Sequence, residues 1–143
     1  MKKLLLSLIS LLFAFNAIAQ TFDYEGLRYT VTSPSEVSVG RIYGVPKTGS
    51  VTIPATVINE GTTYTVTSIR DTAFKYNSVL TSISIPNSIT SIGEQAFVSC
   101  NSLTTVTFDE NSDLNGISSK AFENCAVLTS ISIPNSITSI GEQ

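Results

Sequence analysis

The second half of the chain repeats one order of apolar and polar positions. The sixteen residues LTSISIPNSITSIGEQ at 80–95 recur without change at 128–143. The dipeptide Ala-Phe marks the same order at 73–74, 96–97 and 121–122, with spacings of 23 and 25 residues. A period of about 20 to 50 residues is typical of solenoids and related arrays, in which each unit buries its apolar side against its neighbours. The pattern therefore predicts stacked coils.

Each unit contains two predicted elements. Residues 83–85 alternate as a short strand with one buried face, and Pro86 ends the strand because it cannot donate to a ladder. Residues 94–100 place three apolar side chains on one side, which predicts a single helical or 3-10 turn on the back of the coil. The apolar positions shared by two successive units are the predicted repeat core: Leu80, Ile83, Ile85, Ile89, Ile92, Ala96, Phe97, Cys100, Leu103, Val106, Phe108, Leu114, Ile117, Ala121, Phe122 and Cys125.

Upstream of these units the pattern is weaker but still present. Residues 51–54 copy the strand and its closing proline, and Asn59-Glu60-Gly61 lies between two β-favouring runs, which predicts an inserted hairpin. Turn residues and aromatic strand residues alternate before residue 51, as expected of a cap that covers the end of a solenoid. The unit that begins at Leu103 is longer by two residues, and its register places the insertion in Asp109–Asp113.

The predicted fold class is a β-rich (α/β) solenoid. Short parallel strands form its concave side, short helical or 3-10 turns form its back, and an irregular β cap precedes it. The predicted organisation is a signal peptide at 1–19, the cap at 20–50, a first irregular repeat with the hairpin at 51–79, repeats at 80–102 and 103–127, and a truncated repeat at 128–143.

The first nineteen residues have the three parts of a secretory signal. Lys2 and Lys3 precede an apolar run at 4–15, and the small-residue ending at 17–19 predicts cleavage after Ala19. A membrane anchor is the alternative, but the run is well short of the ~20 residues that span a bilayer. No later stretch is apolar enough to cross a membrane. We therefore expect a secreted or cell-surface protein.

Composition narrows the classes of function. After Ala19 the chain holds six Lys and Arg against eleven Asp and Glu, and it contains no basic run, so nucleic acid is not an expected partner. Histidine is absent, which removes the commonest general base and a common metal ligand. We expect no catalytic residues, no cofactor and no metal site.

Residues 80–102, LTSISIPNSITSIGEQAFVSCNS, resemble the repeat of BspA-like leucine-rich repeat proteins, exported surface proteins of bacteria. The shared pattern is L-x-x-I-x-I-P-x-x-[IV]-x-x-I-G-x-x-A-F-x-x-C, and the likeness extends over residues 51–143. Asn77 departs from it, because it replaces the cysteine of the first unit. The resemblance implies a right-handed, curved solenoid and a role in adhesion and recognition, with host matrix proteins or other bacteria as typical partners.

The predicted concave strands carry a ladder of hydroxyl groups. No base lies near them in the sequence pattern, so they are candidates for binding and not for nucleophilic catalysis. Their small area, on the order of 200 Å² for four strands, indicates that a longer array, the loops or the cap must contribute to a standard interface of ~800 Å² per partner. Tyr24, Tyr29, Tyr43 and Arg41 are the candidates in the cap. The predicted ladder on the concave binding face is Ser82, Ser84, Thr105, Thr107, Ser130 and Ser132.

Two further groups of residues are candidates for chemistry. Cys100 and Cys125 occupy equivalent positions, where side chains point in parallel, which favours buried free thiols over a disulfide. The run Asp109–Asp113 begins like a calcium loop, but its later positions do not match, which favours a solvated turn over weak calcium binding.

Together these features predict a non-catalytic secreted or cell-surface module for protein recognition or adhesion, with a protein or glycan partner. The alternative is a structural spacer, or a truncated fragment of a larger repeat protein without binding activity of its own. The first copy is followed by Ala96-Phe97, so we expect Gln143, the end of the second copy, to be followed by Ala-Phe in a longer chain. An open last repeat is also expected to allow end-to-end self-association.

Overall fold

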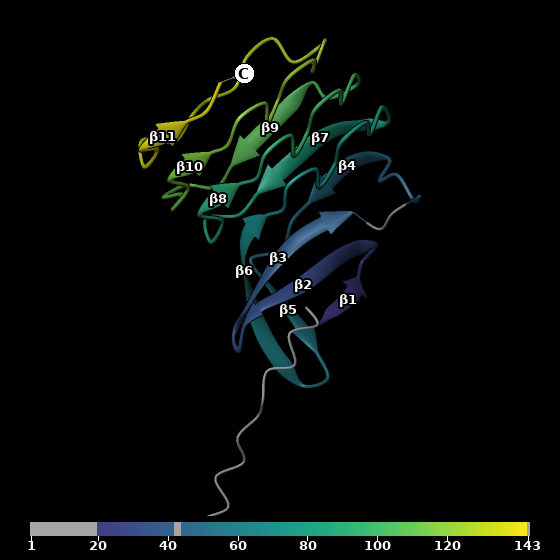
Figure 1. Ribbon diagram of the computed structural model, residues 1–143, viewed down its shortest axis with the longest axis vertical. Helices are drawn as coiled ribbons and strands as arrows, with labels where there is room; N and C mark the ends of the chain where they lie inside the picture. Colours follow the sequence, from purple (N-terminus) through teal and green to yellow (C-terminus); the bar gives the residue numbers. More distant parts are fainter. Residues whose placement is uncertain (1–19, 42–43, 143) are drawn as a thin grey trace, which may run out of the picture.

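A computed structural model describes residues 20–41 and 44–142 of the chain. Figure 1 shows the strands stacked along the long axis, with the N-terminal strands at one end and β11 at the other. Across the described residues no helix is long and apolar enough to cross a membrane. The predicted signal peptide at 1–19, Tyr43 and Gln143 lie outside the described residues.

Three antiparallel strands begin the structure: β1 (Thr21–Tyr24), β2 (Leu27–Ser33) and β3 (Glu36–Arg41). Glu25 and Gly26 connect β1 to β2, and both have positive φ, as the tightest hairpin turns require. Alternate residues of β2 and β3, including Tyr29 and Val39, are fully buried because one face of this sheet packs on the core. The N-terminal strands thus close one end of the hydrophobic interior.

A hairpin is inserted in the first coil where the sequence predicts one. Strand β5 (Thr56–Asn59) pairs antiparallel with β6 (Thr62–Ile69), and the connecting Glu60 and Gly61 have φ of 49° and 79°. Strand β6 also pairs in parallel with β3, so the N-terminal strands share a sheet with the coils. The predicted cap is therefore continuous with the solenoid and is not a separate layer.

Two parallel ladders run through the coils. The first joins β4 (Gly49–Thr52), β7 (Leu80–Ile85) and β9 (Thr105–Phe108) in a three-stranded sheet. The second continues from β6 through β8 (Ser91–Ile92), β10 (Gly116–Ile117) and β11 (Ser139–Ile140) within an eight-stranded sheet. The sequence pattern predicts the first ladder and misses the second, in which β8, β10 and β11 have only two residues each.

The back of each coil is a series of hydrogen-bonded turns, and the described residues contain no helix. The N–H groups of Ala96, Val98 and Cys100 each donate to the carbonyl three residues earlier. Between these turns Gln95 and Ser99 have φ of 54° and 57°. A 3-10 helix needs negative φ throughout, so these left-handed residues replace the expected helical turn with successive single turns.

These back turns are also bonded from coil to coil. The N–H groups of Gln95, Phe97 and Ser99 donate to carbonyl oxygens of residues 119, 121 and 123 in the next coil. The first coil makes the same kind of bond to the second, at Thr72 and Phe74 among others. Along the back, every second N–H therefore bonds within its own coil, and the N–H groups between them bond to the following coil. These bonds satisfy backbone donors that would otherwise be buried without partners.

The core is a column of equivalent residues. Phe74, Phe97 and Phe122 stack face to face with centroid distances of 5.2 and 5.1 Å and nearly parallel rings. Thirteen of the sixteen predicted core positions are buried, and the exceptions, which are partly buried, are Phe108, Phe122 and Cys125. The close packing of the coils requires glycine at position 93. A Cβ there would lie 2.5 Å from the backbone nitrogen of Asp71 in the preceding coil.

The last repeat differs from the expected one. Residues 128–133 do not form a strand on β9, although the sequence predicts a fourth rung there. A groove of about 530 Å³ separates residues 106–109 from residues 132–136, and Asn111 and Ser112 of the two-residue insertion line the same groove. The inserted turn thus occupies the place where the ladder opens.

Candidate binding surfaces

Strands β4, β7 and β9 place hydroxyl side chains in two rows on the outward face of their sheet. Register pairs Ser82 with Thr105 and Ser84 with Thr107, so these four predicted residues come together as a ladder. Ser130 and Ser132 do not join it, since their segment forms no strand and both are exposed. The ladder extends instead in the opposite direction, through Ser50 and Thr52 of β4.

Sequence reasoning missed Ser50 and Thr52 because β4 stands thirty residues before the first regular repeat unit. Their signal was present in the copied strand at 51–53, whose flanking polar residues are these two. The hydroxyl ladder therefore spans three strands, β4, β7 and β9. Three strands at ~4.8 Å spacing offer on the order of 150 Å², well below the ~800 Å² that each side of a standard interface buries.

The ladder has the chemistry of a neutral hydrogen-bonding surface. Within the ladder, Thr107 Oγ1 donates to the carbonyl of Ile83 at 3.4 Å, so this hydroxyl also supports the sheet. Just before β9 and outside the ladder, Thr104 Oγ1 donates to the carbonyl of Thr81 at 3.0 Å. Hydroxyl groups can both donate and accept hydrogen bonds, so this arrangement can offer either to a polar partner.

Both cysteines are free thiols that face the preceding coil. Cys100 Sγ donates to the carbonyl of Phe74, and Cys125 Sγ donates to the carbonyl of Phe97, each at 3.1 Å. Burial raises the pKa of Cys100 to about 12 from an ordinary 9.0, with the neighbouring Cys125 adding to the rise. Burial also raises the pKa of Cys125. These thiols fill and support the core, and their protonated form is not nucleophilic.

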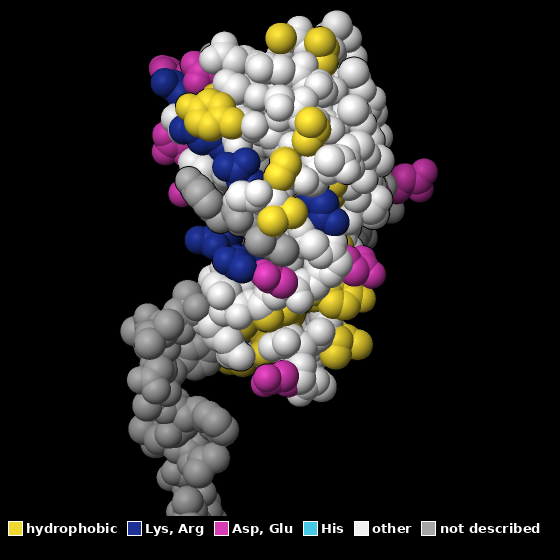
Figure 2. All heavy atoms as spheres, turned by 90° about the vertical axis from the view of Figure 1, so that its right-hand side faces the viewer, with side chains coloured by type: hydrophobic (Ala, Val, Ile, Leu, Met, Phe, Trp, Pro, Cys, Tyr) yellow, Lys and Arg dark blue, Asp and Glu magenta, His cyan; other side chains and the backbone are white. Residues whose placement is uncertain are grey.

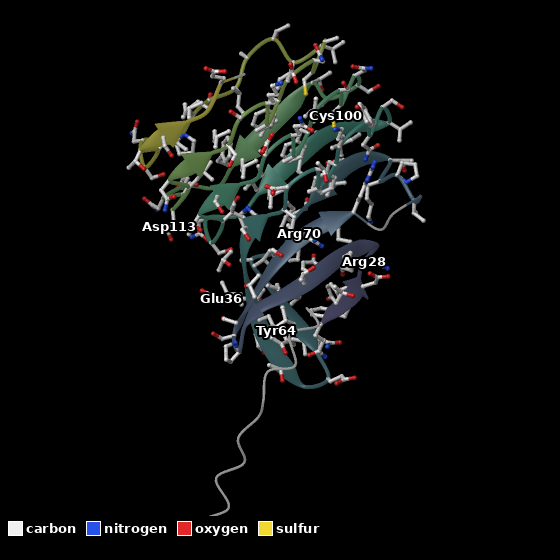
Figure 3. All side chains as sticks on the ribbon, viewed as in Figure 1. Arg28, Glu36, Tyr64, Arg70, Cys100 and Asp113 are labelled. Carbon is white, nitrogen blue, oxygen red and sulfur yellow. The ribbon has the colours of Figure 1, made fainter. Side chains whose placement is uncertain are left out.

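The acidic run Asp109–Asp113 forms an exposed turn at one edge of the coils, where Figure 3 labels Asp113. Asn111 has a positive φ of 56°, and the Asp113 N–H donates to the carbonyl of Asn87. In the part of the chain that the structure describes, no group of three or more His, Cys, Asp or Glu side chains is placed to hold a metal ion. The turn accommodates the two extra residues.

Among the cap candidates, Arg41 lines a groove. Tyr29 is fully buried and stacks on Phe22 at 5.6 Å, whereas Tyr24 is 40% exposed. Arg41 ends β3 beside the back turn of the first coil, and its N–H donates to the carbonyl of Ala73. The groove there has a volume of about 400 Å³, and we call it the seam groove; its lining residues are Gly40, Arg41, Arg70, Asp71, Thr72, Ala73, Lys75 and Tyr76.

Comparison with known families identifies the repeat. A profile of the BspA type leucine rich repeat region matches residues 63–143 in six copies, which is more than half of the chain. The chain therefore belongs to the BspA-type leucine-rich repeat family, and its strand-rich coils are a leucine-rich repeat fold. A search of curated protein sequences found no match.

Solved structures of bacterial leucine-rich repeat proteins share this fold. A leucine rich cell surface protein from Faecalibacterium prausnitzii A2-165 is 32% identical, with a TM-score of 0.74 over 86% of this chain and 33% of that one. A leucine-rich repeat protein from Bacteroides capillosus is 31% identical, with a TM-score of 0.75 over 84% and 86% of the two chains. The pneumococcal vaccine antigen PcpA, at 24% identity and a TM-score of 0.69, supports the fold alone.

The chain spans about a third of the Faecalibacterium protein's length and most of the Bacteroides protein's length. Its relatives are bacterial leucine-rich repeat proteins, and the Faecalibacterium protein is a cell-surface protein by its description. Leucine-rich repeat folds are typically non-catalytic scaffolds for recognition surfaces. The match thus supports a recognition module more than an enzyme.

Proposed function

We propose that this protein is an exported, non-catalytic module that recognises or adheres to a protein on a host or bacterial surface. Family membership carries the proposal, since BspA-type repeats stack into an extended surface of the kind that solenoid proteins use for binding. The outward hydroxyl ladder of β4, β7 and β9 is the part of that surface available in this chain. Hydroxyl groups adapt as donors or acceptors, so they suit a polar partner surface.

Export is the second part of the proposal. The tripartite pattern of the first nineteen residues supports it, as does the description of the Faecalibacterium relative as a cell-surface protein. Expression in a Gram-negative host with recovery of the chain from the periplasm or medium, and an N-terminus at Gln20 by mass spectrometry, tests this part. A chain that keeps Met1 and stays in the cytoplasm contradicts it.

Binding is tested with the purified protein on a biosensor surface, against a panel of extracellular matrix proteins and intact bacterial cells. Because the ladder is small, we expect weak binding that strengthens when the protein is clustered on beads. A ladder variant, Ser84→Arg with Thr107→Arg, is expected to lose binding by at least tenfold. The matched control is Ser78→Arg with Asn101→Arg, two exposed loop residues outside the ladder.

The outcomes separate the proposal from its alternative. Binding to one panel member that the ladder variant loses and the control keeps supports recognition. No binding to any panel member, by protein that melts cooperatively, leaves a structural spacer as the function and contradicts the proposal. Equal loss in both variants contradicts the ladder as the contact surface.

A further inference from the structure

The positive charge of this acidic protein is concentrated at the junction between β3 and the first coil. Three of the six Lys and Arg residues after residue 19 line the seam groove, where a single carboxylate, Asp71, accompanies them. Figure 2 shows Lys and Arg side chains gathered along one band of the molecule, and Figure 3 places Arg70 beside β3. Charges of one sign in a concave site focus the local field and attract ligands of the opposite charge.

The geometry leaves cationic donors directed at the groove. Arg70 Nη1 donates to Thr30 Oγ1 at 2.9 Å, which uses one of the five N–H donors of the guanidinium. Lys75 Nζ donates to Gln95 Oε1 at 2.7 Å and lies 5.0 Å from the ring centroid of Tyr76. Both acceptors are neutral, so these bonds position the cations without cancelling their charge.

The carboxylate of Asp71 has a structural contact of its own. Its Oδ1 accepts the N–H of Glu94 at 2.8 Å, across the step from the first coil to the second. That bond orients the carboxylate toward the backbone and supports the close approach of Gly93. The groove therefore presents more cationic than anionic chemistry to a ligand.

A second groove shares Arg70 and Asp71 with the seam groove and runs along the outer face of the larger sheet. Its volume is about 410 Å³, and hydroxyl groups from four strands and the segment after β10 line it, at Thr32, Ser38, Ser68, Ser91 and Ser118. The pairing of β3, β6 and β8 in the larger sheet aligns Ser38, Ser68 and Ser91 in one row. One cationic end and a row of hydroxyls thus lie side by side.

We propose that these two grooves bind an acidic oligosaccharide. Its carboxylate or sulfate groups contact Arg41, Arg70 and Lys75, and its hydroxyl groups contact the aligned Ser38, Ser68 and Ser91. Arginine matches planar and tetrahedral oxyanions with paired donors. Tyr76, which is 65% exposed, offers an apolar ring face with a polar tip to a sugar ring. Each groove has the volume of a small-ligand site, which favours a few sugar units over a protein surface.

The inference goes beyond adhesion through the hydroxyl ladder, because it uses a different surface. Isothermal titration calorimetry with a heparin-derived hexasaccharide, which carries sulfate and carboxylate, is the main experiment. Oligogalacturonate, which carries carboxylate alone, distinguishes the two anionic groups, and maltohexaose is the neutral control. We expect binding of one or both acidic probes and at least a tenfold preference over maltohexaose, decreasing when salt rises and screens the charges.

Variants assign the binding to the grooves. The variant Arg70→Gln with Lys75→Gln is expected to weaken binding at least tenfold. Arg28→Gln with Lys120→Gln removes the same charge from residues that line neither groove, and is expected to change Kd less than twofold. If the first variant melts at a lower temperature than the native protein, Lys75→Gln with Tyr76→Ala replaces it, because Tyr76 is mostly exposed and its loss leaves the core intact.

Each result decides the proposal. Tenfold loss in the groove variant alone supports it, and the oligogalacturonate arm then says whether carboxylate suffices. Absence of binding to both acidic probes, equal loss in both variants, or tighter binding of hexaglutamate than of either oligosaccharide overturns it, the last by assigning the groove to an acidic peptide. If these fail while the ladder-dependent binding to a surface protein persists, the proposed function stands without this inference.

Discussion

Residues 80–94 and 128–142 have the same sequence but different structures. In the first stretch β7 pairs with a strand on each side, and Ile85 and Ile92 are completely buried. In the second stretch no strand forms at 128–133, and the equivalent residues Ile133 and Ile140 are 39% and 53% exposed. Identical letters therefore acquire different structures because their neighbours differ, as expected when coils gain stability mainly through nearest-neighbour contacts.

The two copies share some of their contacts with the preceding coil. Ser88 Oγ donates to the carbonyl of Val66 at 2.8 Å, and its copy Ser136 Oγ donates to the carbonyl of Leu114 at 2.7 Å. Both bonds reach the preceding coil, and the two copies keep them equally. Among the described residues, the second copy lacks both the pairing of residues 128–133 with β9 of the preceding coil and a following coil that accepts its N–H groups. The serine bond and the pairing of β11 with β10 are the contacts with the preceding coil that it keeps.

The largest expected contrast comes from a charge placed at matched positions. Ile85→Asp introduces an unpaired carboxylate into the core and should cost at least about 4 kcal/mol, enough to prevent folding. Ile133→Asp changes a residue that is already partly exposed and should cost less than about 1 kcal/mol. Circular dichroism and urea unfolding of both variants test the contrast. Similar losses for the two would show that the second stretch is as well packed as the first.

Truncation at the second ladder should separate the copies more gently. Ile92→Ala removes a fully buried side chain and should lower the free energy of unfolding by about 2–5 kcal/mol. Ile140→Ala should lower it by less than about 1 kcal/mol, because half of the side chain already contacts solvent. Urea midpoints measured at constant m-value provide the comparison. A loss at Ile140 equal to that at Ile92 would contradict it.

Burial of the two cysteines should make the stability of the coils depend on pH. The pKa of Cys100 is raised from 9.0 to about 12 in the folded protein, so its contribution is complete below pH 9 and is lost as pH rises toward 12. In this interval the unfolded thiol ionises while the folded one does not, so stability falls by up to about 1.4 kcal/mol per pH unit.

The measurement is the urea midpoint between pH 8.5 and 10.5 in native protein and in Cys100→Ala. Removal of the thiol should flatten the decline. Cys125→Ala should flatten it less, since Cys125 is only partly buried. An unchanged slope in Cys100→Ala would show that other groups cause the decline.

The smallest expected contrast tests the direction of the bonding. Ser88→Ala and Ser136→Ala each remove a hydroxyl bond to the preceding coil and should each cost about 1 kcal/mol. The difference between them should be near zero, in opposition to the isoleucine pairs. Double variants that combine each serine change with Ile140→Ala show whether the bonds act independently. A Ser136 loss much smaller than the Ser88 loss would mean that bonding to the preceding coil also weakens in the second copy.

Sequence periodicity predicts the features that depend on one side chain per unit. It locates the core positions, the hairpin at Glu60-Gly61, and the two extra residues, which lie between the pairs Ile85–Phe108 and Ser91–Gly116 of the two ladders. It does not predict the turns on the back, because positive φ falls at Gln95 and Ser99, residue types without a preference for it. It also misses β8 and β10, since two residues are too few to show alternation.

The candidate sites follow the same rule. The rungs Ser82–Thr105 and Ser84–Thr107 are predictable because they repeat with the unit. Ser132 fails because its place depends on the neighbouring turn and not on its own sequence. The seam groove could not be predicted as a set, since the pairing of β3 with β6 brings Arg41 beside Arg70 across twenty-nine positions of the chain.

The stacked phenylalanines at centroid spacings of 5.2 and 5.1 Å imply how the molecule bears a mechanical load. When its ends are pulled along the stack, the coils carry the tension in series, and each coil peels from its neighbour separately. A released coil of 23 residues adds about 75 Å of extended chain. Single-molecule stretching should show evenly spaced steps of that length, and one abrupt rupture would contradict it. A solenoid that unfolds in this way lengthens under load and absorbs mechanical work one coil at a time.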